Sequence, residues 1–119
     1  MSFSAVMNYT GQDYYCDVAL KGHVELRKVY ESEGVLAYHH TRPFWPVHIV
    51  VIPKKHIASF TTVSREDLPV MMELMDVLKS VAAGVEREHG AARILTNLGK
   101  YQDSKHLHFH VNSGEPIRQ

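Results

Sequence analysis

The 119-residue sequence has a single cysteine, Cys16, so it cannot form a disulfide bridge within one chain. Such cysteine usage fits a reducing compartment. A chain of this length buries about two-thirds of its unfolded surface, enough for an apolar core without covalent staples. We therefore expect one domain over residues 1–119, in which the polar and weakly patterned residues 1–14 are loosely ordered or lie along the surface.

Long apolar runs are also missing. The longest runs, such as IVVI at 49–52, are far too short to cross a bilayer. The opening MSFSAVMNYT lacks the basic stretch and apolar segment of a secretory signal. These features predict a cytoplasmic protein with no membrane partner.

The chain has no excess of either charge. Thirteen lysines and arginines balance thirteen aspartates and glutamates. Binding to a nucleic-acid polymer depends on a basic surface that neutralises phosphates, so this balance argues against such a partner. A small phosphate-bearing ligand needs only a few local donors and remains possible.

Histidine, in contrast, is abundant, with nine in the chain. The stretch KHLHFHVNSG at 105–114 places His106, His108 and His110 at every second position. On an extended strand, alternate residues share one face at a spacing of about 6.6 Å. The apolar residues between them would then face the other way, which predicts a strand with one dry side and one imidazole side.

Three explanations of this pattern compete. A half-exposed strand that is polar by accident is the poorest, because histidine is uncommon and here repeats three times. A metal site is the second, since two imidazoles at i and i+2 can chelate zinc. The third is nucleophilic or acid–base chemistry, because imidazole attacks phosphorus or carbonyl carbon and moves protons near neutral pH.

The remaining pattern predicts an α+β fold. Residues 23–32 and 34–40 form two strands joined by a turn, residues 47–52 a third strand stopped by Pro53, and RILTN at 93–97 a fourth. The histidine stretch adds a fifth strand. With no regular alternation of strands and helices, these strands favour an antiparallel sheet covered on one face by a helix.

One long helix is predicted to begin at Ser64. SRED at 64–67 has the spacing of a capping box, and Gly90 is a suitable terminator. Pro69 either lies near enough to the start to be tolerated or shifts the start by a turn. The expected core-facing stripe consists of Leu68, Met71, Met72, Met75, Leu78, Ala82 and Val85.

Other polar residues accompany the triad. His48 opens the third strand, from which it can neighbour the histidine strand across the sheet. Asn97, Gln102 and Ser104 lie in the loop before the triad and offer the donors that a phosphate requires. Each of these loop residues alone could equally cap its own turn.

Taken together, these segments resemble the histidine triad (HIT) family. HLHFHV at 106–111 is similar to the family signature, and VLAYHHTRPFWPVHIVVIPKKHI at 35–57 is similar to its central segment. TNLG at 96–99, followed by a glutamine four residues before the triad, resembles the loop that precedes the signature. The resemblance covers residues 16–114 and implies a five-stranded antiparallel sheet with one long and one shorter helix, paired as a homodimer.

The resemblance also implies a chemistry. The middle histidine, here His108, attacks the α-phosphorus of a nucleotide derivative and forms a nucleotidyl-histidine, which water then hydrolyses. His110 stabilises the phosphoryl oxygens or helps to protonate the leaving group, and its identity points to hydrolysis because the transferase branch has Gln there. His106 and His48 brace the site. Substrate contacts are implied for Asn97 and Gln102, and we add Ser104 and His40 as candidates.

Three positions depart from the family pattern. The nucleoside-binding branch has an acidic residue for the ribose hydroxyls where this chain has His40, and the family commonly has Ser or Thr where this chain has Asp103. Some relatives carry two cysteines that, with two histidines, hold zinc. Here the equivalent set is Asp13, Cys16, His56 and His106, with one thiolate missing.

The leading hypothesis is therefore a nucleotide phosphohydrolase that cleaves a nucleoside phosphoramidate or a related conjugate, such as a dinucleoside polyphosphate. It requires no cofactor. A nucleotide-binding regulatory protein with weak or lost catalysis is the alternative, and a metal-binding histidine cluster is the third hypothesis.

Overall fold

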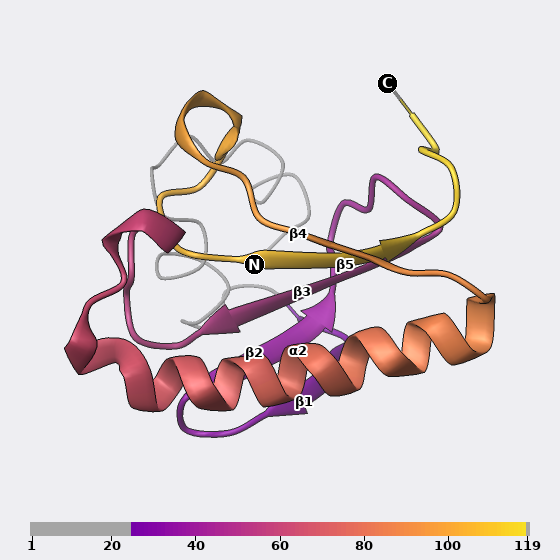
Figure 1. The fold of residues 1–119 in the computed structure, drawn as a ribbon. Helices are drawn as coiled ribbons and strands as arrows, with labels where there is room; N and C mark the ends of the chain where they lie inside the picture. The colour runs from indigo at the N-terminus through magenta and orange to yellow at the C-terminus, as the bar shows by residue number, and fades with distance from the viewer. Residues whose placement is uncertain (1–24, 119) are drawn as a thin grey trace.

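The computed structural model describes residues 25–118, which contain one five-stranded antiparallel sheet with a long helix on one face (Figure 1). The strand order is β1-β2-β3-β5-β4, so β1 and β4 form the two edges. The strands are β1 (Lys28–Glu31), β2 (Val35–His39), β3 (Val47–Pro53), β4 (Arg93–Leu95) and β5 (Phe109–Ser113). This architecture confirms the predicted fold class.

The helix α2 (Leu68–His89) is the one α-helix between residues 25 and 118. The shorter helix implied by the family resemblance is not found there, and the predicted loose order of residues 1–14 falls outside the described residues. In the part of the chain that the structure describes, no helix is both long and apolar enough to span a membrane.

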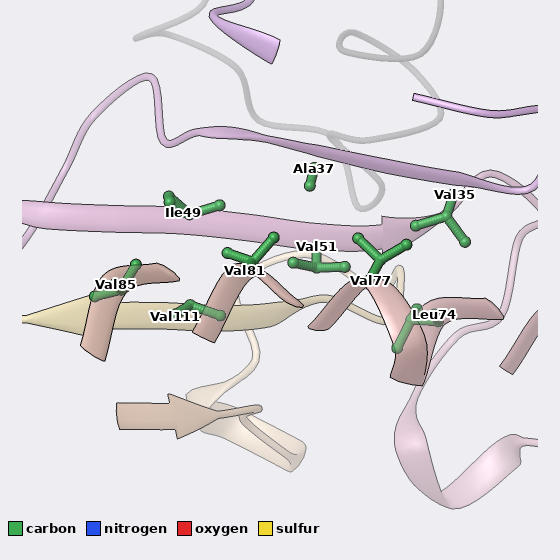
Figure 2. Close-up of a cluster of buried hydrophobic side chains, with 9 residues drawn as sticks. All are labelled: Val35, Ala37, Ile49, Val51, Leu74, Val77, Val81, Val85 and Val111. Carbon is green, nitrogen blue, oxygen red and sulfur yellow. The ribbon is translucent and has the colours of Figure 1, made fainter. Parts of the chain in front are cut away.

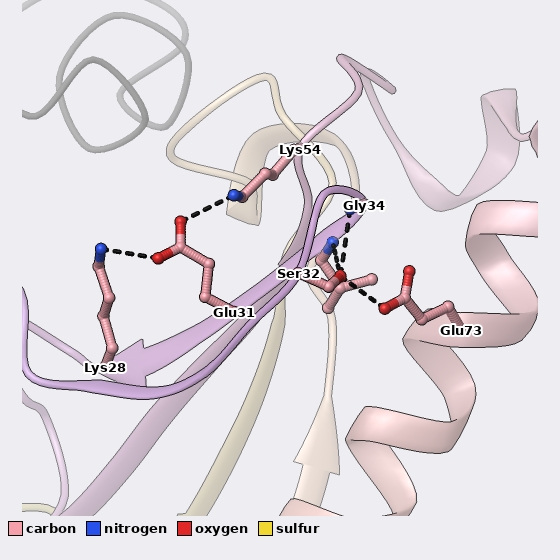
Figure 3. A network of polar contacts seen from close by, with 7 residues as sticks. Lys28, Glu31, Ser32, Gly34, Lys54 and Glu73 are labelled. Atoms are coloured by element: carbon pink, nitrogen blue, oxygen red, sulfur yellow. Dashed lines mark hydrogen bonds and ion pairs between the residues drawn. The ribbon is translucent and has the colours of Figure 1, made fainter.

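Side chains hold the turn between β1 and β2 and join it to α2 (Figure 3). The Ser32 hydroxyl accepts bonds from the N–H groups of Gly34 and Val35, both at 3.1 Å, and donates to Glu73 of α2 at 2.5 Å. A Cβ on Gly34 would lie 2.7 Å from the Glu73 carboxylate oxygen, so a larger residue there would displace the Glu73 side chain from its present position. The predicted turn is confirmed.

The start of the helix differs from the prediction. Ser64 begins a 3₁₀ turn, Arg65–Asp67, and α2 starts only at Leu68, with Pro69 in its first turn. The predicted capping box exists, because the Ser64 N–H donates to the Asp67 carboxylate at 2.9 Å, but it caps this 3₁₀ turn. Proline favours the first helical turn, so it sets the helix start one turn later. Gly90 ends the helix at φ 82°, as expected.

The core lies between α2 and one face of the sheet (Figure 2). Five strand residues meet four helix residues there: Val35, Ala37, Ile49, Val51 and Val111 against Leu74, Val77, Val81 and Val85.

The predicted helix stripe was partly wrong. Leu68, Met72 and Met75 are 51%, 70% and 65% exposed, although Val85 is buried and Met71, Leu78 and Ala82 pack at the edge of the core. The helix is apolar over two neighbouring stripes. Both have helical spacing, so periodicity alone did not identify the one that packs.

The other face of the sheet carries the histidines. Strand alternation places His48 with Val50 and Ile52 of β3 on the face away from the helix, where a second apolar cluster lies. The histidine strand is shorter than predicted, because β5 begins at Phe109 and His106 and His108 precede it. The Leu107 N–H donates to the Ile57 carbonyl at 2.6 Å, which ties this preceding stretch to the segment after β3.

Candidate functional site

Four imidazoles gather on the face of the sheet opposite α2. The ring centroids of His108 and His110 are 4.9 Å apart, as are those of His48 and His110. His40, just beyond the end of β2, stacks on His48 at 4.4 Å with the planes 22° apart. The expected contact between His48 and the triad is therefore present.

The proton positions in the His48–His110 pair follow from a main-chain donor. The Phe44 N–H donates to Nδ1 of His48 at 3.0 Å, so neutral His48 carries its hydrogen on Nε2. That Nε2 lies 2.7 Å from Nδ1 of His110 and donates to it. Neutral His110 then carries its own hydrogen on Nε2 and presents a donor at its far side.

His108 has the opposite arrangement. Its Nδ1 lies 2.7 Å from the main-chain carbonyl of His106, which can only accept. The hydrogen is therefore on Nδ1 and the lone pair on Nε2. A neutral imidazole with this lone pair is a nucleophile, whereas its neighbour His110 is a donor.

Burial keeps His40, His48 and His110 neutral near pH 7. His48, His108 and His110 are 5%, 4% and 8% exposed. Desolvation lowers the pKa of His48 and that of His110 to about 3, with the neighbouring histidines adding to the shift. The pKa of His40 falls to about 4, again chiefly by burial.

His106 lies behind this cluster and is fully buried. Its Nε2 donates to the Pro53 carbonyl at 2.7 Å, and its ring meets that of His56 edge to face at 5.4 Å. The contact joins the stretch before β5 to the end of β3.

The loop residues have different surroundings from those expected. The Gln102 side-chain amide donates to the main-chain oxygens of Ala58 and Ser104, at 2.7 and 2.9 Å, so both of its hydrogens brace the loop. Ser104 is itself 8% exposed. In this arrangement both amide hydrogens of Gln102 are used within the loop, which is the turn-bracing alternative left open by the sequence, and its contact with a substrate stays a prediction.

Asn97, in contrast, follows the end of β4 and is only partly buried. The preceding Thr96 hydroxyl donates to the His108 carbonyl at 2.7 Å, which brings this end of the strand beside the triad. Sequence reasoning did not single out Thr96.

Only two of the four candidate zinc ligands lie among the described residues. His56 and His106 are neighbours, but Asp13 and Cys16 fall outside the described residues. Between residues 25 and 118, no group of three or more histidine, cysteine, aspartate or glutamate side chains is arranged to hold a metal ion.

Several groups that fix the site were missed from sequence. The N–H of Phe44 and the carbonyls of Pro53 and His106 are main-chain atoms, which any residue could supply. Arg118 was also missed. Its guanidinium donates to the Arg42 carbonyl at 2.9 Å. The two residues are 76 positions apart in the sequence, so no local motif predicts this contact.

Comparisons with known proteins agree with this fold. Residues 21–117 match the HIT domain family. An uncharacterised HIT-like protein of Helicobacter pylori is 31% identical over 98 residues, covering 81% of this chain and 91% of that protein. One from Azospirillum brasilense is 36% identical, covering 82% and 83%. The chain therefore belongs to the HIT family.

Solved structures are similar as well. A HIT family hydrolase from Legionella pneumophila superposes with a TM-score of 0.73 at 27% identity, covering 89% of this chain and 96% of that one. A hypothetical histidine triad nucleotide-binding protein from Sulfolobus tokodaii gives 0.71 at 29% identity, covering 86% and 70%.

Proposed function

We propose that this protein is a nucleotide phosphohydrolase that cleaves nucleoside phosphoramidates or related nucleotide conjugates through a nucleotidyl intermediate on His108. The observation that carries the proposal is the bond from His108 Nδ1 to the His106 carbonyl, which puts the lone pair on Nε2. The hydrolase and nucleotide-binding descriptions of the Legionella and Sulfolobus proteins support the same chemistry.

In the proposed first step, Nε2 of His108 attacks the α-phosphorus and forms a P–N bond. The bond from phosphorus to the leaving nitrogen breaks as that nitrogen takes up a proton. Positive charge develops on the attacking ring, and the His106 carbonyl at Nδ1 stabilises it. Water then attacks phosphorus, the P–N bond to His108 breaks, and the nucleoside monophosphate leaves.

His110 is the proposed electrophilic partner. Its Nε2–H, set by the His48 contact, is directed to stabilise the phosphoryl oxygens or to supply the leaving-group proton. Because His110 stays neutral near pH 7, it donates without placing a fixed cation next to the attacking ring. We propose bracing roles for His48 and His106 and a phosphate contact for Asn97.

The test is intact-protein mass spectrometry after rapid mixing with adenosine and with guanosine 5′-phosphoramidate. We expect a transient adduct of one nucleoside monophosphate, followed by free monophosphate. His108→Ala should abolish the adduct and lower turnover by about 1,000-fold or more. His89→Ala is the matched control, because His89 lies at the exposed end of α2 and should leave both unchanged.

Two results would contradict the proposal. Normal turnover by His108→Ala would remove this residue as the nucleophile. No adduct and no product from either substrate would exclude purine phosphoramidate hydrolysis.

We also propose that the chain forms a homodimer. The edge strand β4 exposes Ile94, and α2 exposes Met72 and Met75, so apolar side chains of two elements face solvent in the single chain. A second copy that covers them would bury this surface.

A further inference from the structure

His40 lies within the histidine cluster, although it belongs to neither β3 nor β5. Its main-chain N–H donates to the His48 carbonyl at 2.8 Å, and its ring stacks on that of His48. The ring centroid is 6.2 Å from that of His110. His40 therefore lies close to the position where we propose that His110 contacts the phosphate.

The hydrogen-bonding character of His40 follows from a main-chain donor, as it does for His48. The Arg42 N–H donates to Nδ1 of His40 at 2.9 Å. In the neutral ring, the hydrogen is therefore on Nε2, and this atom can only donate. A carboxylate at this position would accept bonds from hydroxyl groups, whereas His40 requires an acceptor on the ligand.

A cation also acts on the His40 ring. The Arg42 carbonyl accepts from the guanidinium of Arg118 at 2.9 Å, so one residue contacts both His40 and Arg118. The C-terminal stretch is anchored there by a second bond, from the Ile117 N–H to the Phe44 carbonyl at 2.8 Å. Arg118 is exposed at this point, and its charge acts on both His40 and His48.

The charges that act on His40 are of both signs. Arg118 and a charge on His108 lower its pKa, while Asp103 raises it by a smaller amount. Arg118 also lowers the pKa of His48, after burial and the charge of His40.

From these contacts we infer that the substrate carries a second anionic oxygen group, a phosphate or a carboxylate, which Nε2–H of His40 and the guanidinium of Arg118 bind beside the phosphate under attack. This inference rests on the proposed function, which puts that phosphate between His108 and His110. A ribose with two free hydroxyl groups would use the same position less well. Its hydroxyl oxygens could accept hydrogen bonds from His40 and Arg118, but its hydroxyl hydrogens would find no acceptor on these two side chains.

Binding to His108→Ala protein tests the inference separately from turnover. Calorimetry at constant ionic strength would compare adenosine 5′-phosphate with the 2′,5′- and 3′,5′-bisphosphates, and with a 3′-O-succinyl ester of the monophosphate. We expect at least one doubly anionic ligand to bind about tenfold or more tightly than the monophosphate, as charge-assisted hydrogen bonds allow. Preference for the succinyl ester over the bisphosphates would identify a carboxylate as the group.

Two variants locate the effect. Arg118→Gln should remove most of this preference, whereas Arg87→Gln on the exposed surface of α2 should retain it. His40→Asp should reverse the preference toward the monophosphate with free hydroxyls. Because Arg118 is exposed near the C-terminus, its replacement leaves folding intact and keeps the test informative.

Equal affinity for all four ligands would overturn the inference while leaving the proposed hydrolysis standing. An equal loss in Arg87→Gln and Arg118→Gln would overturn it too, because the preference would then be a general charge effect. Failure of the proposed function has a different signature, namely no adduct with wild-type protein whatever the affinities.

Discussion

At the scale of single residues, main-chain atoms decide where the protons of the cluster lie. The Phe44 N–H sets the tautomer of His48, and His48 in turn sets that of His110. The His106 carbonyl sets the tautomer of His108. One ring consequently presents a lone pair and its neighbour a hydrogen. Phosphoryl transfer requires this division, in which one group attacks phosphorus and another stabilises its oxygens.

Long-range proton–nitrogen NMR of the imidazoles at pH 7 reads these tautomers directly. We expect His108 to carry its hydrogen on Nδ1, and His48 and His110 to carry theirs on Nε2. In His48→Phe the ring of His110 loses its donor, and its tautomer should become mixed while that of His108 is unchanged. A hydrogen on Nδ1 of His110 in the wild-type protein would contradict the arrangement.

The candidate residues themselves were largely accessible from the sequence. Alternation marked His106, His108 and His110, and the opening of a strand marked His48. For Gln102 the sequence left two roles open, because a polar residue in a loop looks the same whether it faces a ligand or, as here, donates to Ala58. The surroundings of His40 depend on a contact with residue 118, which no local spacing reveals.

At the scale of elements, the helix shows that the spacing of apolar residues does not by itself identify the face that packs on the sheet. Leu74 is fully buried, whereas Met72, two positions earlier, is 70% exposed. Strands β2 and β3 were predicted closely, because a glycine turn and a proline bounded them, whereas β1 and β5 begin later than predicted. The helix carries two adjoining apolar stripes, and only the shape of the sheet selects between them.

Urea unfolding of two helix variants tests this assignment. Leu74→Ala should lower the free energy of unfolding by about 3 kcal/mol, since it leaves a cavity between α2 and the sheet. Met72→Ala should change it by less than about 0.5 kcal/mol at concentrations where the chain is monomeric. Similar losses in both variants would mean that the helix packs through a different face.

At the scale of the whole molecule, the cluster makes stability depend on pH. His40, His48 and His110 have pKa values of about 4, 3 and 3 in the folded chain, against an ordinary value of 6.5. Between these values the unfolded chain binds more protons than the folded one. Their contribution to stability is therefore complete above pH 6.5 and is lost as the pH falls toward 3.

We expect the free energy of unfolding to fall by at least about 2 kcal/mol between pH 7.5 and 5.0. The carboxylates with lowered pKa, Glu31, Asp67 and Glu73, do not contribute in this window, because their stabilisation is lost only as the pH falls below about 4.5. Urea titrations at the two pH values measure the difference. His48→Phe should reduce it and His89→Ala should not, whereas an unchanged free energy would contradict burial of neutral rings.

The anchoring of the imidazoles on peptide groups has a consequence for how this protein can vary over evolutionary time. A peptide N–H at position 44 survives any replacement except proline, and a peptide carbonyl at position 106 survives every replacement. Mutational drift in the side chains around the cluster can therefore alter which molecules are recognised while the assignment of attacker and donor is inherited unchanged. The main chain thus preserves which histidine attacks and which donates, whereas the side chains that select the ligand can change.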